Sequence, residues 1–260
     1  MVRGIDIFQE YFAAYSENYV IIGGTACDIL IAEAGFRPRA TKDIDIILVV
    51  EALNVDFVRQ FWQFIQDGNY EHKEESTDGR KYYRFTKPEN TNFPFQLELF
   101  ARIPDLVKLP EDAHLTPIPV DDDLSSLSAI LLSDDYYNYM IAQSRIEEDI
   151  HIANTEALIC LKAKAYMEIA DRIAKGSTED RKQLNKHKND VFKLAVLLSA
   201  DSRFELKESI KANMQAFVNT IADKITDKAV LLDMGIRNTE PISIFQQVIK
   251  SFQLQTPTKK

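Results

Sequence analysis

The stretch that decides the fold runs from residue 21 to residue 48 and reads IIGGTACDILIAEAGFRPRATKDIDIIL. Its first two residues are the end of an apolar run over residues 19–22 that is rich in β-branched side chains. Such a run predicts a buried strand. Gly23 and Gly24 follow at once and mark a tight turn. Residues 25–34 then read as a helix, so a strand, a glycine turn and a helix start follow one another.

The second half of this stretch predicts a loop and a central strand. Gly35 is well placed as the C-cap of the helix, and residues 37–42, RPRATK, read as a basic loop. Residues 43–50, DIDIILVV, become apolar on both faces after the two acids. Such a run predicts a strand in the middle of a sheet, where both faces are covered.

Asp43 and Asp45 are the most informative pair of residues in the chain. Side chains two apart on a strand share one face, so the two carboxylates are neighbours. Neighbouring carboxylates repel each other unless a cation lies between them, and Mg²⁺ prefers oxygen ligands of this kind. The alternative is a pair of solvated acids at the mouth of a strand, because the Asp-x-Asp pattern alone is common.

A third acid, Glu98, stands in the apolar strand FQLELF over residues 95–100. A carboxylate in so apolar a strand needs a partner. If this strand lies beside residues 43–50, three acids converge, as they do in a two-metal site. The alternative is that Glu98 pairs with a lysine or an arginine on an exposed face.

The glycine turn offers a place for a phosphate group. Gly23 and Gly24 let the backbone approach an anion, and the amides and dipole of the following helix attract it. Thr25 can add its hydroxyl, and Asp43 follows it by 18 residues, which is room for one helix and one loop. The alternative is a plain turn, because most glycine pairs are no more than that.

The same stretch resembles the signature of the DNA polymerase β-type nucleotidyltransferase superfamily, and within it the AbiEii-type abortive-infection toxins. Their pattern is Gly-Gly-Thr-Ala, a helix, an Arg-x-Thr/Ser stretch, Asp-x-Asp and a carboxylate on a later strand. It falls here on Gly23, Gly24, Thr25, Ala26, Arg39, Thr41, Asp43, Asp45 and Glu98. By this resemblance the glycine turn with Thr25 would hold the triphosphate, and the three acids would be catalytic and bind Mg²⁺ or Mn²⁺. Arg39 and Thr41 would support the site.

Two segments of the C-terminal half continue the resemblance: LICLKAKAYMEI from residue 158 and KHKNDVFKL from residue 186. They imply that Lys162 and Lys188 contact phosphate and that Asp190 is a supporting acid. The common relatives read Lys-Asp-x-x-Asp where this chain has Lys-Asn-Asp. The alternative for Lys162, and for Lys164 beside it, is a lysine that reaches from an apolar stripe to solvent. His187 is expected to be exposed.

The chain as a whole predicts an α+β fold: a nucleotidyltransferase-type mixed sheet flanked by helices, followed by a C-terminal helical bundle. The expected domains are a nucleotidyltransferase core over residues 1–120 and a mostly helical domain over residues 121–260. Helices are expected at 5–16, 54–66, 134–143, 155–174, 187–200, 203–224 and 240–252. Further strands are expected at 70–75, 81–86, 95–100 and 125–132, with a connector at 103–120, an acidic turn at 121–123 and a polar loop at 176–185.

Composition and charge place the chain among ordinary globular proteins. Its 260 residues are 45% hydrophobic, and the net charge of −9 argues against a protein that coats nucleic acid. Cys27 and Cys160 stand apart in apolar stretches, which disfavours a disulfide framework or a zinc site. No run reaches the length of a membrane span and no signal core opens the chain, so a cytoplasmic protein is expected.

The function that follows is Mg²⁺- or Mn²⁺-dependent transfer of a nucleoside monophosphate from an NTP to a hydroxyl group. The sequence does not identify the molecule that accepts the nucleotide. A tRNA end, a protein side chain and a small molecule are the alternatives. The likeness to the toxins adds an antitoxin protein as a partner, in a toxin–antitoxin or phage-defence system. The alternative function is a non-catalytic NTP-binding or partner-regulated interaction module.

Overall fold

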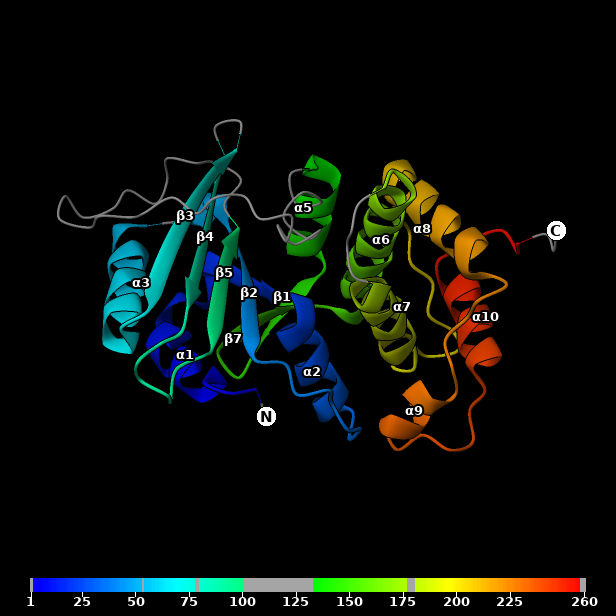
Figure 1. Ribbon diagram of the computed structural model, residues 1–260, viewed down its shortest axis with the longest axis horizontal. Helices are drawn as coiled ribbons and strands as arrows, with labels where there is room; N and C mark the ends of the chain where they lie inside the picture. The colour runs from blue at the N-terminus through cyan, green and yellow to red at the C-terminus, as the bar shows by residue number, and fades with distance from the viewer. Residues whose placement is uncertain (1, 53, 78–79, 101–132, 177–180, 258–260) are drawn as a thin grey trace. The chain divides into compact units, whose positions relative to one another are not determined.

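The computed structural model describes residues 2–52, 54–77, 80–100, 133–176 and 181–257 (Figure 1). The chain divides into two compact units. The sheet unit is drawn from residues 1–28, 39–124 and 140–153, and the helical unit from residues 29–38, 125–139 and 154–260. Several predicted features lie outside the described residues: the domain boundary at 120, the connector at 103–120, the acidic turn at 121–123 and the strand at 125–132.

Among the described residues, seven strands form one mixed sheet in the order β3-β4-β5-β2-β1-β7-β6. β2 is parallel to β5 and β1 is parallel to β7, whereas the other neighbours are antiparallel. The strands are β1 (Tyr19–Ile22), β2 (Asp43–Leu48), β3 (Glu71–Thr77), β4 (Arg80–Thr86), β5 (Gln96–Phe100), β6 (Ser144–Glu147) and β7 (Ile150–Ala153). The predicted fold class, a mixed sheet with helices, is confirmed.

One face of the sheet is apolar and packs against two helices, α1 (Ile5–Phe12) and α3 (Val55–Gly68) (Figure 1). The ring of Phe8 on α1 meets Tyr19 of β1 edge-on, with centroids 5.3 Å apart. The ring of Phe61 on α3 meets Phe85 of β4 in the same way, at 5.6 Å. On β2 this face is formed by every second residue: Ile44, Ile46 and Leu48, all buried. The intervening acids of β2 therefore point to the opposite face.

Local signals explain where α3 begins and ends. Asn54 is the N-cap, and its side-chain oxygen accepts a hydrogen bond from the backbone N–H of Phe57 at 2.8 Å. The start of the helix expected from residue 54 is confirmed. Asn69 ends the helix in the left-handed conformation, with φ of 47°, and its N–H returns to the last helical carbonyls. Capping at both ends holds α3 at a defined length against the sheet.

The helical unit holds most of α5 and all of the later helices. These are α5 (Asp134–Ala142), α6 (Thr155–Ala174), α7 (Arg181–Ala195), α8 (Glu208–Ile221), α9 (Ala229–Asp233) and α10 (Pro241–Ser251). Tyr136 and Tyr137 of α5 are buried and belong to the core. Among the described helices, none combines the length and the apolarity needed to cross a membrane.

One sequence-based expectation about an element was wrong, and one hairpin was missed. The polar run from Arg181 was expected to be loop, but it forms the first turns of α7, because Arg, Lys, Gln and Leu are good helix formers and only the later turns are buried. The hairpin of β6 and β7 was not expected. Its turn consists of Glu148 and Asp149, both with positive φ, and neither residue gives the glycine signal that marks most such turns.

Candidate active site

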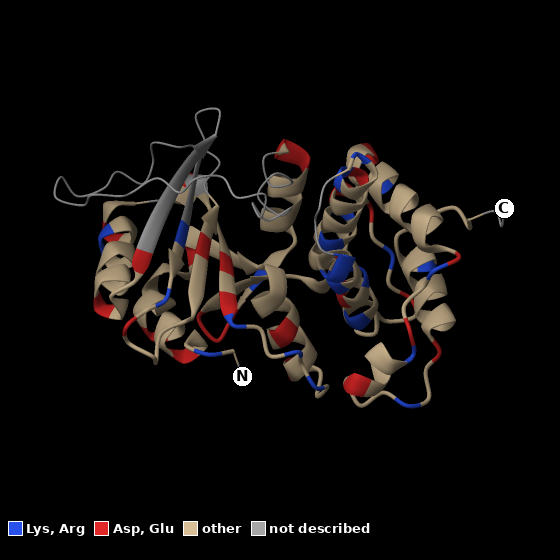
Figure 2. Cartoon of the chain, in the orientation of Figure 1, with Lys and Arg blue, Asp and Glu red and all other residues tan. Residues whose placement is uncertain are grey.

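The acids of β2 and β5 lie side by side on one face of the sheet. The parallel register pairs Asp45 with Glu98, and Asp43 with Gln96. Figure 2 shows acidic residues on the two neighbouring strands. Residues paired across neighbouring strands point to the same side, so Asp43, Asp45 and Glu98 share the face opposite α1 and α3. Glu98 is buried, while the two aspartates are partly exposed.

The neighbouring strand β4 adds a cation to this face. Arg84 pairs with Glu98 in the antiparallel register, and its Nε donates to Glu98 Oε1 at 2.9 Å. The same oxygen accepts a hydrogen bond from Gln96 Nε2 at 2.8 Å. Sequence reasoning left open that Glu98 pairs with a lysine or an arginine, and it does. Arg84 itself was not singled out, although strand parity in the hairpin would have placed it on this face.

These side chains fit a divalent cation in their chemistry. Carboxylate oxygens are the ligands that Mg²⁺ and Mn²⁺ prefer, and Asp43 and Asp45 offer them from one strand. Within the part of the chain that the structure describes, no three His, Cys, Asp or Glu side chains are gathered as a preformed metal site. Glu98 Oε1 is held by Arg84 and Gln96, so its use as a ligand would require those contacts to rearrange.

The carboxylate of Asp45 lies against the backbone of the glycine turn. β1 ends at Ile22, which pairs with Asp45, and helix α2 (Gly23–Glu33) begins at the next residue. Gly23 has a φ of +70°, and a Cβ placed on it would lie 1.7 Å from Asp45 Oδ2. Only glycine satisfies both this conformation and this close approach. The sheet register and the turn together bring the Asp-x-Asp pair to the start of α2.

Gly23→Ala is therefore expected to destabilise the protein by more than backbone strain alone. A left-handed alanine costs about 1–2 kcal/mol, and here the added methyl group also displaces the Asp45 carboxylate. Gly35→Ala is the matched control, because Gly35 has a φ of +79° but a Cβ on it meets nothing within 4 Å. Urea unfolding should show a larger loss of stability for Gly23→Ala, and equal losses would contradict the contact.

Thr25 ties the start of α2 to the start of β2. Its side chain is fully buried, and its hydroxyl donates a hydrogen bond to the main-chain carbonyl of Asp43. A hydroxyl has one proton to donate, so this proton is already used. What Thr25 offers an anion is its main-chain N–H in the first turn of a helix, where such groups have no partner within the helix. The predicted role of Gly24 and Thr25 in holding a triphosphate stays a prediction.

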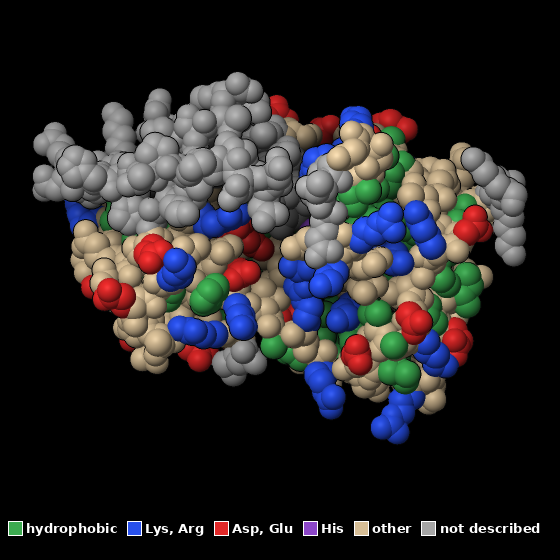
Figure 3. All heavy atoms as spheres, in the orientation of Figure 1, with side chains coloured by type: hydrophobic (Ala, Val, Ile, Leu, Met, Phe, Trp, Pro, Cys, Tyr) green, Lys and Arg blue, Asp and Glu red, His purple; other side chains and the backbone are tan. Residues whose placement is uncertain are grey.

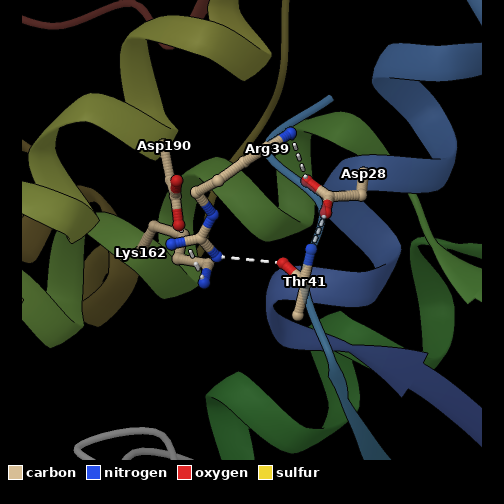
Figure 4. Close-up of polar contacts among 5 residues, drawn as sticks. All are labelled: Asp28, Arg39, Thr41, Lys162 and Asp190. Atoms are coloured by element: carbon tan, nitrogen blue, oxygen red, sulfur yellow. Dashed lines mark hydrogen bonds and ion pairs between the residues drawn. The ribbon is translucent and has the colours of Figure 1, made fainter. Parts of the chain in front are cut away.

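The basic loop folds over the same helix start. A Cβ on Gly24 would lie 2.9 Å from Arg39 Nη2 and 2.9 Å from Thr41 Oγ1, so both side chains lie directly over this glycine. Arg39 Nη2 also donates to Thr41 Oγ1 at 3.2 Å (Figure 4). The carboxylate of Asp28, on α2, accepts hydrogen bonds from the backbone N–H groups of Arg39 and Thr41. Asp28 was missed in the sequence, although an acid inside the apolar helix CDILI is a signal that could have found it.

In the helical unit, Lys162 of α6 and Asp190 of α7 form a buried ion pair (Figure 4). Lys162 Nζ lies 3.2 Å from Asp190 Oδ2, and the two side chains are 2% and 5% exposed. The alternative that Lys162 reaches from an apolar stripe to solvent is therefore wrong. His187 is also buried, contrary to expectation, because the face of α7 that carries it packs into the unit.

Lys188 joins α7 to the segment that follows α8 in the same unit. Its Nζ donates to the main-chain carbonyl of Lys224, just beyond the end of α8, at 2.9 Å. Burial, and then the charge of Lys224, lower the pKa of Lys188. The exposed side of α7 carries more positive charge, from Arg181, Lys182 and Lys186, and Figure 3 shows basic side chains gathered over the helical unit. Phosphate binding by Lys162 and Lys188 stays a prediction.

Comparison with known proteins adds little to these observations. No family model matches the sequence, and no curated protein matches it. One solved structure with a similar arrangement is an antigenic nucleotidyltransferase-like protein from Paracoccidioides brasiliensis. It is 13% identical, with a TM-score of 0.42, over 89% of this chain and 100% of that chain. A likeness of this size carries no argument about function.

Proposed function

We propose that this protein is a Mg²⁺- or Mn²⁺-dependent nucleotidyltransferase that transfers a nucleoside monophosphate from an NTP to a hydroxyl group. The observation that carries the proposal is the contact between Asp45 and Gly23. It joins three acids on one sheet face to a helix start that is suited to phosphate. Metal-binding carboxylates and a phosphate-binding turn are the two parts that a nucleotidyl transfer site needs within reach of each other.

Each group has a role in this proposal. Asp43 and Asp45 would hold the metal, which when bound lowers the pKa of an attacking hydroxyl and neutralises phosphate charge. Glu98 would complete the acidic row beside Asp45. The main-chain N–H groups of Gly24 and Thr25 would bind the triphosphate, and the guanidinium of Arg39 over Gly24 would balance charge on the leaving pyrophosphate.

The acceptor and partner belong to the same proposal. The acceptor supplies a hydroxyl group, carried by a tRNA end, a protein side chain or a small molecule. The likeness of residues 21–48 to AbiEii-type toxins supports a toxin-like role in a toxin–antitoxin or phage-defence system, with an antitoxin protein as the regulating partner. Lys162, Lys188 and Asp190 are retained as candidate supporting residues on the same likeness.

One observation favours a second function, a non-catalytic NTP-binding or partner-regulated module. Glu98 is held by Arg84 and Gln96, so the acidic face is partly neutralised without a metal. In such a module the Arg84–Glu98 ion pair would be permanent, and Asp43 and Asp45 would be the remaining acids of the row. The two functions differ in whether nucleotide binding needs a divalent cation.

Calorimetric titration with ATP, GTP, CTP and UTP tests the proposal. At least one of these nucleotides is expected to bind in Mg²⁺ or Mn²⁺ and to lose most of its affinity in excess EDTA, because its phosphates share the metal with Asp43 and Asp45. Adenosine, which lacks phosphates, is the control and should show no metal dependence. Metal-independent binding would favour the module, and no binding under any condition would refute both functions.

Arg84→Gln is expected to tighten Mn²⁺ binding by up to about fivefold. The substitution removes a cation that competes with the metal for Glu98, and a partly exposed ion pair contributes about 0.2–1 kcal/mol. Lys87→Gln is the matched control: it removes one positive charge next to β4, from an exposed ion pair with Glu71. Electron paramagnetic resonance of free Mn²⁺ measures both. Weaker binding by Arg84→Gln would show that Arg84 orients Glu98 instead of competing for it.

A further inference from the structure

A buried carboxylate, Asp28, organises the basic loop next to the candidate phosphate site. Its side chain lies on α2 and is 3% exposed. A carboxylate so far from water is unfavourable unless hydrogen bonds compensate for the lost hydration. Asp28 Oδ1 accepts from the backbone N–H of Arg39 at 3.3 Å, and Oδ2 accepts from that of Thr41 at 2.5 Å (Figure 4). Each oxygen therefore receives one loop N–H group.

The two hydrogen bonds to Asp28 stabilise a loop whose backbone conformation is unfavourable by itself. Ala40, which lies between the two donors, has a φ of +65°. An alanine in this left-handed region is strained, because its Cβ crowds the following carbonyl oxygen. The bonds to Asp28 offset that strain and hold the flanking residues in place. The side chains of Arg39 and Thr41 then lie over Gly24, where Arg39 Nη2 and Thr41 Oγ1 are each 2.9 Å from the position that a Cβ on this glycine would take.

We propose that Asp28 is a positioning residue for nucleotide binding, and that it acts through Arg39. It holds the loop so that the guanidinium stays over the first turn of α2, where a cation and main-chain N–H groups converge on one anion. Guanidinium groups bind phosphate oxygens in a planar, two-pronged geometry, which makes the placement of the side chain important for affinity. This inference rests on the proposed function and assigns its phosphate contact to Arg39.

Asp28→Asn is the sharpest change, because it keeps the size of the side chain. An amide has one acceptor oxygen, and its NH₂ group would face a loop N–H group, so one of the two hydrogen bonds is replaced by two opposed donors. The loop is expected to loosen and Arg39 to leave Gly24. Gly24→Ala is a second way to move Arg39, because the added Cβ would displace the side chains of Arg39 and Thr41.

The test is a double-mutant cycle on the full chain, with ATP and Mn²⁺ as the titrated pair. Asp28→Asn, Gly24→Ala and Arg39→Ala are each expected to weaken ATP binding about tenfold, the effect of losing one charge-assisted phosphate contact. The double variant Asp28→Asn with Arg39→Ala should bind ATP no more weakly than Arg39→Ala alone, because residues that act through one contact are not additive. Adenosine affinity, which involves no phosphate, should be the same in all variants.

Each outcome supports or overturns the inference. Additive losses in the double variant, or an equal loss of adenosine affinity, would show that Asp28 supports the fold in general and would overturn it. Unchanged ATP affinity in Asp28→Asn would do the same. If Asp28→Asn does not fold, Gly24→Ala tests the phosphate contact that the inference assigns to Arg39, and unchanged ATP affinity there overturns the inference. If the wild type binds no nucleotide, the proposed function itself fails, which the wild-type titration shows separately.

Discussion

Asp45→Asn is expected to lower nucleotidyl transfer by about 10³-fold or more while the protein stays folded. The metals would lose a central ligand, and the support that a metal gives the transition state is worth several kcal/mol, with tenfold in rate for each 1.4 kcal/mol. Folding should not suffer, because Asp45 is partly exposed and shares its face of β2 with the like charge of Asp43. A melting temperature equal to or above that of the wild type is therefore expected.

The measurement is transfer of label from α-labelled NTP, in the presence of Mn²⁺, to the RNA, protein and small-molecule fractions of a cell extract. Asp56→Asn is the matched control, because Asp56 is an aspartate of the same unit with an exposed ion pair to Arg59. It should keep both activity and stability. If Asp45→Asn unfolds the protein, Asp45 is a structural acid with a fixed cationic partner and the metal argument is wrong.

Lys162→Met is expected to destabilise the protein by about 3–5 kcal/mol. The substitution removes the ammonium group that lies 3.2 Å from Asp190 Oδ2, so it takes one positive charge away from a buried carboxylate. Lys164→Met is the matched control on the same helix. Lys164 is 27% exposed and pairs with Glu168 at 3.5 Å, so its loss should cost less than about 1 kcal/mol. Equilibrium urea unfolding measures both.

A second variant separates the ion pair from simple packing. Lys162→Met combined with Asp190→Leu removes both charges, and replacing a buried pair by apolar side chains of similar size is often neutral or stabilising. The double variant should therefore recover most of the stability that Lys162→Met loses. No recovery would mean that the interior around α6 and α7 needs the shape of Lys162 and not its charge.

The acidic face could be predicted because its geometry is local. Residues two apart on a strand share a face whatever the rest of the chain does. The prediction of a strand was therefore enough to place Asp43 and Asp45 side by side. Glu98 needed one further assumption, that its strand lies beside β2, and the parallel register bears this out. The Gly-Gly turn could be predicted for a similar reason, because a strand that ends in glycines before a helix is a short-range pattern.

Strand parity would have placed Arg84 on the acidic face, but which side chain each of these residues contacts could not be predicted. Asp28 bonds to backbone groups 11 and 13 residues away, and Arg84 lies 14 residues from Glu98. Nothing in the neighbouring sequence indicates which side chain lies closest once the chain folds back. The same holds for Lys162 and Asp190, where helical spacing shows an apolar stripe on α6 but not which residue of α7 faces it.

The sequence by itself determined the order of the elements around Gly23, the face of β2 that carries the acids, and the residue types available for a metal and a phosphate. Those features follow from backbone periodicity and from the freedom of glycine, which act within a few residues. Only the tertiary structure decided that Glu98 is held by Arg84, that Asp28 folds the loop over Gly24, and that Lys162 is buried against Asp190. These three contacts join residues that are far apart in the sequence. A charged group is stabilised by whichever partner lies within hydrogen-bonding distance in the folded chain, and the local sequence does not specify that partner.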